Sequence, residues 1–128
     1  MFSVTQRKGL MAFHFNPKVD GEEGAVHSHP YTIAVTVAGE KLDENSLLLD
    51  VNLLERSLNL ALSVLNGKVL NELPEFLGSF PSIENLAYVI WLRMLVDLDP
   101  SRIEWLEVTV WEDGDVSATY KERVPSRV

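Results

Sequence analysis

The three histidines of the chain are the residues whose spacing could support metal chemistry. His27 and His29 lie one residue apart at the start of an alternating apolar segment, VHSHPYTIAVTVAG (26–39). Residues i and i+2 of a strand project from the same face, so the two imidazoles would lie side by side. Imidazole is the commonest metal ligand in proteins. Two imidazoles on a rigid strand therefore predict part of a metal site. A complete site would need a third ligand from elsewhere in the chain.

Composition and charge narrow the class of protein. The chain has 128 residues, 46% hydrophobic and 23% charged, which is typical of a single folded domain spanning residues 1–128. A formal net charge of −8 argues against nucleic acid as a partner. The absence of cysteine excludes disulfides, thiolate ligands and a cysteine nucleophile, and fits a cytoplasmic location. The longest apolar run, residues 86–98, is too short to span a membrane.

Two strands are expected before the first helix. Residues 2–15 predict an opening strand that is bulged near Gly9. Residues 16–26 are rich in proline, glycine and acids and predict a loop. The alternating segment that carries the histidine pair predicts a second strand over about residues 27–38.

Two helices should follow, each with a capping residue. Asp50 is the expected N-cap of a helix over residues 51–66, which Asn66-Gly67 would end. Ser82 is the expected N-cap of a second helix, whose apolar stripe continues to residue 98. Glu84 lies in its first turn, where the helix dipole favours an acid.

The end of the chain predicts a second pair of strands. Residues 103–112 alternate with period two, and the turn Asp113-Gly114-Asp115 leads into a last strand over residues 116–123. The order ββααββ indicates an α+β domain, with a four-stranded antiparallel sheet and two helices on one of its faces. The open edges of such a sheet invite pairing with another subunit, so we expect a homo-oligomer.

Six motifs occur in the order in which one known family carries them. They are MAFHF with His14, VHSHPY with the histidine pair, LLLDV (47–51), VLNE (69–72), PSIENLA (81–87) and VTVWED (108–113). On these motifs the sequence resembles the 6-pyruvoyl-tetrahydropterin synthase / 6-carboxy-tetrahydropterin synthase family over nearly the whole chain.

The resemblance implies a fold, a metal and a substrate. The fold is the tunnelling fold, in which subunits join their sheets into a barrel, usually as a hexamer of two stacked trimers with active sites at the subunit interfaces. The metal is Zn²⁺ held by His14, His27 and His29 with an open fourth position, acting as a Lewis acid on the side-chain hydroxyls of a dihydropterin. Glu112 would anchor the pterin by accepting from its N3–H and exocyclic amine. Ser82 and Glu84 are further candidate substrate contacts.

The sequence departs from the family at two catalytic elements. Glu23 lies where the family has its catalytic cysteine, and Asn66-Gly67 stands where the family has an Asp-His pair. Some members with a glutamate at or beside the cysteine position cleave dihydroneopterin triphosphate to 6-hydroxymethyl-dihydropterin. Glu23 is therefore a candidate general base, although an acid beside Glu22 in a loop can also be simply solvated.

Two classes of function remain open. The first is a zinc-dependent lyase acting on the C6 side chain of dihydroneopterin triphosphate or dihydroneopterin, in folate, tetrahydropterin or queuosine-type deazapurine biosynthesis. The second is a non-catalytic zinc- and pterin-binding relative with a regulatory or structural role. The loss of both the cysteine and the Asp-His pair is the reason for the second.

Overall fold

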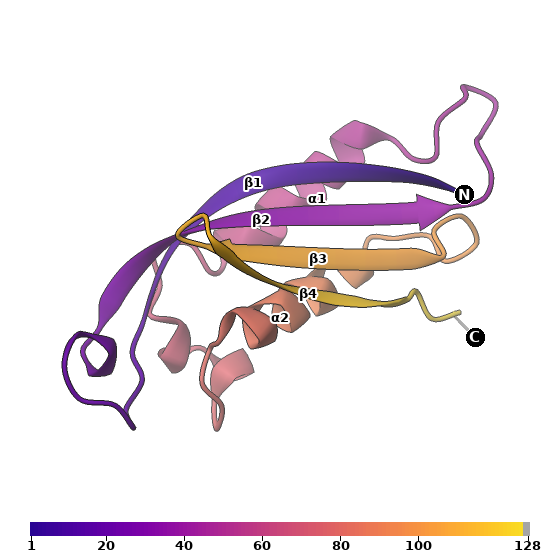
Figure 1. Ribbon diagram of the computed structural model, residues 1–128. Coiled ribbons are helices and arrows are strands. Elements are labelled where there is room, and N and C mark those ends of the chain that lie inside the picture. The colour runs from indigo at the N-terminus through magenta and orange to yellow at the C-terminus, as the bar shows by residue number, and fades with distance from the viewer. Residues whose placement is uncertain (127–128) are drawn as a thin grey trace.

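A computed structural model describes residues 1–126 and contains one sheet and two main helices (Figure 1). The strands are β1 (Phe2–His14), β2 (His27–Gly39), β3 (Trp105–Glu112) and β4 (Val116–Arg123). They form a four-stranded antiparallel sheet in the order β1-β2-β3-β4, with the helices between β2 and β3 in the chain. The expected α+β fold is confirmed.

The first two strands form a long, continuous hairpin. Their register runs without interruption from Phe2 opposite Gly39 to His14 opposite His27. The expected bulge near Gly9 is wrong, because Gly9 pairs directly with Thr32. A bulge would also have shifted the alternation of faces along β1. Because the register is unbroken, the last side chain of β1 projects from the same face as the buried side chains of that strand.

Both helices begin at the residues that the sequence predicts and end earlier. In α1 (Val51–Ser63) the Asp50 carboxylate accepts from the Asn52 N–H at 2.9 Å, and α2 (Ile83–Leu95) begins after Ser82. The predicted ends at residues 66 and 98 are wrong, because the chain leaves each helix through tighter turns. Similarly, β3 begins at Trp105 rather than at residue 103, since residues 99–103 form a turn. Within residues 1–126, no helix is long and apolar enough to cross a membrane.

The core lies between the sheet and the two helices, which cover one face of the sheet (Figure 1). The indole N–H of Trp91 in α2 donates to the carbonyl of Leu106 in β3 at 2.8 Å, which ties the two layers together. Fully buried side chains come from both layers: Ile33, Val35, Val37, Leu106, Val108 and Val110 from the sheet, and Leu54, Leu58, Leu86, Ile90 and Met94 from the helices.

One end of the sheet brings together the segments that matter for function. The end of β1, the start of β2 and the β3–β4 hairpin all lie at the left of Figure 1. Asp113, Gly114 and Asp115 connect the paired residues Glu112 and Val116, and Asp113 and Gly114 have positive φ angles of 54° and 85°. The tight hairpin predicted at Asp113-Gly114 is therefore present, and its tip lies near the histidines.

Candidate functional site

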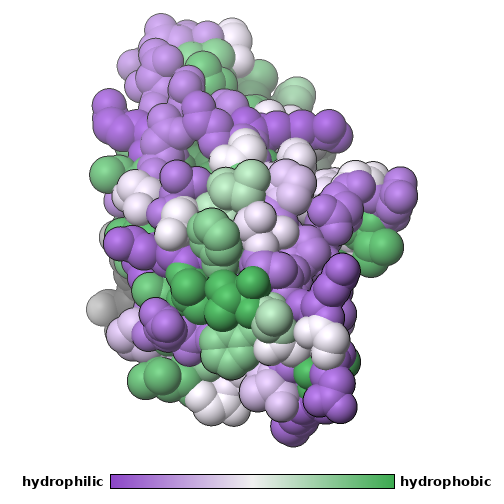
Figure 2. All heavy atoms as spheres, turned by 90° about the vertical axis from the view of Figure 1, so that its left-hand side faces the viewer, coloured by the Kyte–Doolittle hydropathy of each residue, from purple (hydrophilic) through white to green (hydrophobic). Residues whose placement is uncertain are grey.

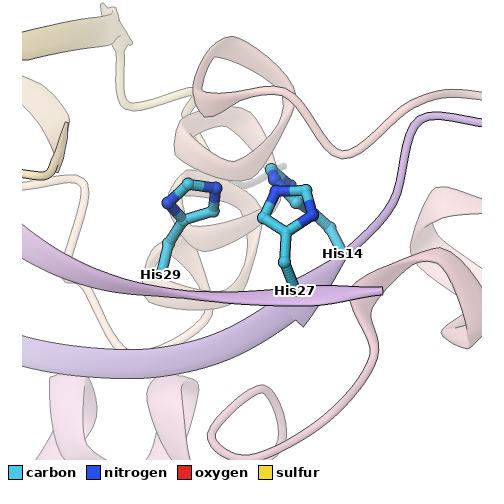
Figure 3. Close-up of side chains that lie close together, drawn as sticks. All are labelled: His14, His27 and His29. Carbon is cyan, nitrogen blue, oxygen red and sulfur yellow. The ribbon is translucent and has the colours of Figure 1, made fainter. Parts of the chain in front are cut away.

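The three histidines meet on the helix-covered face of the sheet. His14 ends β1 and lies opposite His27, the first residue of β2, while His29 follows on the same face. The ring centroids are 4.7 Å apart in each of the three pairs. Figure 3 shows the three rings side by side above the two strands. The structure thus brings together all three ligands that the sequence predicts.

Each imidazole is oriented through its Nδ1 atom. The Nδ1 atom of His27 lies 2.8 Å from the carbonyl oxygen of Ala25, and that of His14 lies 3.3 Å from the carbonyl oxygen of Pro81. The Nδ1 atom of His29 lies 3.2 Å from a carboxylate oxygen of Asp113. An oxygen acceptor at Nδ1 favours the tautomer that carries its proton there, and leaves Nε2 with a lone pair.

The three Nε2 atoms, which could bind a metal ion, have no hydrogen-bond partner among the described residues. All three are buried and make no hydrogen bond in the part of the chain that the structure describes. One nitrogen from each ring belongs to a group of potential ligand atoms lying within 4.8 Å of one another. Buried polar atoms normally have partners, so three adjacent exceptions call for an explanation. A metal ion bound by three neutral imidazoles fits this donor set.

A histidine binds a metal through its neutral imidazole, and burial favours this neutral form. Burial lowers the pKa of His14 from its ordinary value, and charge on His29 or His27 would lower it further, while the hydrogen bond to Pro81 opposes the shift. A lowered pKa keeps His14 unprotonated at neutral pH. Because a protonated imidazole cannot ligate a metal, this environment suits metal binding.

Two carboxylates border the histidine cluster. A carboxylate oxygen of Glu23 lies 3.5 Å from Nε2 of His27, and one of Glu112 lies 3.6 Å from Nε2 of His29. Glu112 ends β3 opposite Tyr31, and burial followed by the nearby carboxylates raises the pKa of the Tyr31 hydroxyl. The cluster therefore combines three imidazoles with two acids, and each acid lies beside the Nε2 atom of a different histidine.

The loop between β1 and β2 is folded so that Glu23 reaches the cluster. Glu23 lies in a short 3₁₀ turn (Glu22–Gly24), and its carbonyl accepts from the Asn16 N–H at 2.8 Å. A side chain at Gly24 would place its Cβ 1.9 Å from the carbonyl oxygen of Val19, so the close approach requires glycine. The side chain of Glu23 remains 64% exposed and accessible to a ligand.

The other two candidate substrate contacts lie at the start of α2. Ser82 follows Pro81, whose carbonyl faces His14, but its hydroxyl accepts from the Asn85 N–H at 3.1 Å and caps the helix. Glu84 is exposed in the first turn and is not grouped with the histidines among the described residues. The structure thus brings the backbone beside Ser82 to the cluster, and leaves Glu84 outside it.

Removing the cap of α2 should reduce stability. We expect Ser82→Ala to lower the free energy of unfolding by about 1 kcal/mol, because the Asn85 N–H loses its acceptor. Urea denaturation of the purified protein measures this change. Ser79→Ala, at an exposed serine of the preceding loop, is the control and should be close to neutral. Equal stability of the two variants would contradict the capping role.

Asn66 and Gly67 cover the outer edge of β1. The Asn66 side-chain oxygen accepts from the Met11 N–H at 3.1 Å, and the Gly67 N–H donates to the Met11 carbonyl at 2.7 Å. Further along, the Asn71 side chain both donates to and accepts from the backbone of Phe15. Asn66 and Gly67 thus have a structural role at a strand edge.

Sequence reasoning did not identify Asp113 or Pro81 as parts of the site. Asp113 was expected as a turn residue and as the last residue of the VTVWED motif, without a role in the site. The carbonyl oxygens of Ala25 and Pro81 carry no signal in residue type. The strand register could have located Asp113, since Glu112 lies opposite Tyr31 and the next residue then falls beside His29.

The amino-acid sequence matches one protein-family model and one curated protein. Residues 3–123 match the model of the family described as 6-pyruvoyl tetrahydropterin synthase. A curated relative, the 6-carboxy-5,6,7,8-tetrahydropterin synthase of Bacillus subtilis (strain 168), is 34% identical over 56 residues. That match covers 43% of this chain and 38% of the relative, so the aligned part spans less than half of either protein.

Solved structures share the fold over almost the whole chain. The 6-pyruvoyl tetrahydropterin synthase of Caenorhabditis elegans matches with a TM-score of 0.77 and 21% identity, covering 94% of this chain and 95% of that one. The Plasmodium vivax enzyme, with a catalytic glutamate replaced by alanine, matches with a TM-score of 0.79 and 14% identity, covering 95% and 98%. An uncharacterized protein of Wolinella succinogenes matches with a TM-score of 0.68 and 14% identity, covering 93% and 97%.

Proposed function

The chain belongs to the 6-pyruvoyl tetrahydropterin synthase family, and from this premise we propose that it is a zinc-dependent lyase acting on the C6 side chain of a dihydropterin. The substrate would be dihydroneopterin triphosphate or dihydroneopterin. The observation that carries the proposal is the set of three buried imidazole nitrogens that have no hydrogen-bond partner among the described residues. The curated relative, a tetrahydropterin synthase, supports the choice of substrate class.

His14, His27 and His29 would hold the zinc. One nitrogen of each ring lies within 4.8 Å of the other two, and hydrogen-bond acceptors at Nδ1 fix each ring. Three protein ligands would leave a fourth position for substrate, as in catalytic rather than structural zinc sites. When bound, zinc would supply Lewis-acid polarisation of the hydroxyls on the C6 side chain.

Glu23 would act as the general base. Its carboxylate lies 3.5 Å from Nε2 of His27 and is exposed to an entering ligand, so it could accept a proton from the C6 side chain. The structural relative from Plasmodium vivax has a glutamate described as a catalytic residue, which supports a glutamate in this role. Glu23 would then replace the cysteine that this chain lacks.

Glu112 would anchor the pterin ring. Its side chain is 29% exposed, so it can reach a ligand while the sheet restricts its movement. A carboxylate that accepts from both the N3–H and the exocyclic amine makes a charge-assisted, two-pronged contact. Ser82 and Glu84 belong to the same proposal as secondary contacts at the start of α2.

We expect Glu112→Gln to weaken substrate binding. The loss of charge-assisted hydrogen bonds worth about 1.5–3 kcal/mol should raise KM by about 10- to 100-fold with kcat less affected. Steady-state kinetics with the zinc-loaded protein measure both parameters. Glu107→Gln, at an acid on the opposite face of the same strand, is the control. An unchanged KM for Glu112→Gln would contradict the anchoring role.

A homo-oligomer belongs to the proposal, as a hexamer of two stacked trimers located in the cytoplasm. Figure 2 faces the end of the molecule that carries the site, and hydrophobic side chains gather near its centre among hydrophilic ones. Exposed apolar residues in the segments at this end include Val26, Leu77 and Val116. Apolar surface of this kind favours contact with a neighbouring subunit. The acidic net charge supports a partner other than nucleic acid.

One observation favours a second candidate function, a non-catalytic zinc- and pterin-binding protein. Asn66 and Gly67 are occupied with the backbone of Met11 and offer no proton-transferring group. Such a protein would keep the histidines and Glu112 and would bind the pterin without converting it.

Incubation of the zinc-loaded protein with 7,8-dihydroneopterin triphosphate, followed by mass analysis of the pterins, separates these candidates. A new 6-hydroxymethyl, 6-pyruvoyl or 6-carboxy pterin that is absent with His27→Ala would support the lyase. Unchanged substrate that still binds, with dihydroneopterin also unchanged, would support the non-catalytic candidate. Absence of both turnover and pterin binding would contradict the proposed function.

A further inference from the structure

We infer that Asp113 is a positioning residue that holds His29 for metal binding. This inference rests on the proposed zinc site. A carboxylate oxygen of Asp113, in the turn between β3 and β4, lies 3.2 Å from Nδ1 of His29 in β2. The opposite nitrogen of the same ring, Nε2, is buried and has no hydrogen-bond partner among residues 1–126. Asp113 thus fixes the side of the ring that faces away from the metal position.

The geometry of the turn does not by itself require an aspartate at this position. Asp113 and Gly114 have positive φ angles of 54° and 85°, and asparagine or glycine would satisfy this turn equally well. Asp115, the other acid of the turn, is exposed and is not grouped with His29 in the described part of the chain. The carboxylate of Asp113 therefore has a role that its neighbour lacks.

His29 differs from the other two histidines in the charge of its partner. His14 and His27 have neutral backbone carbonyls at Nδ1, from Pro81 and Ala25. Only His29 has a carboxylate at Nδ1 within the described residues. A carboxylate that accepts from Nδ1–H fixes the tautomer and raises the basicity of the ligating nitrogen. His29 should consequently be the strongest zinc ligand of the three.

The two consecutive acids Glu112 and Asp113 lie on opposite sides of the same ring. Glu112 approaches Nε2 of His29 at 3.6 Å, on the metal side, whereas Asp113 approaches Nδ1. One imidazole cannot direct both nitrogens at a single ion. The group formed by His29, Glu112 and Asp113 is therefore an extension of the histidine site, with Asp113 outside the ligand set.

Zinc affinity measured by competition with a chromophoric chelator tests this inference. We expect Asp113→Gly, which keeps the turn but removes the acceptor, to bind zinc about 10- to 100-fold more weakly than the wild type. Asp113→Asn keeps a neutral acceptor and should fall between the two. Asp115→Asn is the matched control and should bind zinc like the wild type. The d–d absorption of the Co²⁺-loaded protein should change in Asp113→Gly, because its ligand field depends on how His29 is held.

The outcomes separate this inference from the proposed function. A wild-type protein that binds no zinc would overturn both. Loss of zinc in His29→Ala, together with wild-type affinity and an unchanged Co²⁺ spectrum in Asp113→Gly, would overturn the inference and leave the zinc site intact. Circular dichroism of the metal-free variants checks that they fold. If Asp113→Gly did not fold, wild-type zinc affinity in Asp113→Asn would overturn the inference.

Discussion

Replacing His27 by alanine is expected to abolish zinc binding and turnover together. Structural zinc sites with four ligands bind with about 10–16 kcal/mol, or about 3 kcal/mol for each ligand. Losing one ligand should therefore weaken zinc binding by at least about 100-fold. The His27 side chain is 22% exposed at the start of β2, so its loss should cost the metal-free protein little stability. Chelator competition and the product assay measure the two effects.

The serine between the two ligands provides the control. Ser28 lies on the opposite face of β2 and is exposed, so Ser28→Ala should retain zinc and turnover. His14→Ala is a less direct test, because His14 is 3% exposed and its removal would also leave a space in the packed interior. Wild-type zinc affinity in His27→Ala would remove His27 from the ligand set.

Replacing Glu23 by glutamine is expected to stop chemistry while zinc binding continues. Glutamine has nearly the same shape as glutamate and cannot accept a proton at neutral pH. General-base catalysis typically contributes about 100- to 10,000-fold, so kcat should fall by a factor in that range. Zinc affinity should change little, since the three imidazoles that would hold the metal remain. Single-turnover kinetics with the zinc-loaded variant measure the chemical step.

Glu22 is the matched control for Glu23. It is the neighbouring exposed acid in the same 3₁₀ turn, and Glu22→Gln carries the same change in charge. We expect turnover close to that of the wild type. If Glu23→Gln turned over at the wild-type rate, Glu23 would not be the base and another group would have to accept the proton.

The main elements of the fold could be predicted because local chemistry and tertiary packing agree. Alternating residues in β2 place Tyr31, Ile33 and Val35 on the core face, as their burial shows. Asp50 and Ser82 begin the two helices with the hydrogen bonds expected of N-caps. The hairpin between β1 and β2 then places His14 opposite His27, so the histidine cluster follows from strand register.

The details that complete the site depend on contacts distant in sequence. Glu23 reaches the histidines because its loop is held by Asn16 and needs glycine at position 24. The orientation of His14 depends on a carbonyl 67 residues away, which no residue type encodes. Glycine at position 9 permits a bulge without requiring one, and pairing with Thr32 determined the outcome. Propensity alone cannot resolve such choices.

X-ray absorption at the zinc edge of the metal-loaded protein tests the central claim most directly. The claim is that His14, His27 and His29 hold one zinc ion through the Nε2 nitrogens, which have no hydrogen-bond partner among residues 1–126. The spectrum should show three imidazole nitrogens at about 2.0–2.1 Å and one exchangeable oxygen ligand. A first shell with fewer than three imidazoles would contradict the claim, as would a protein that retains no zinc.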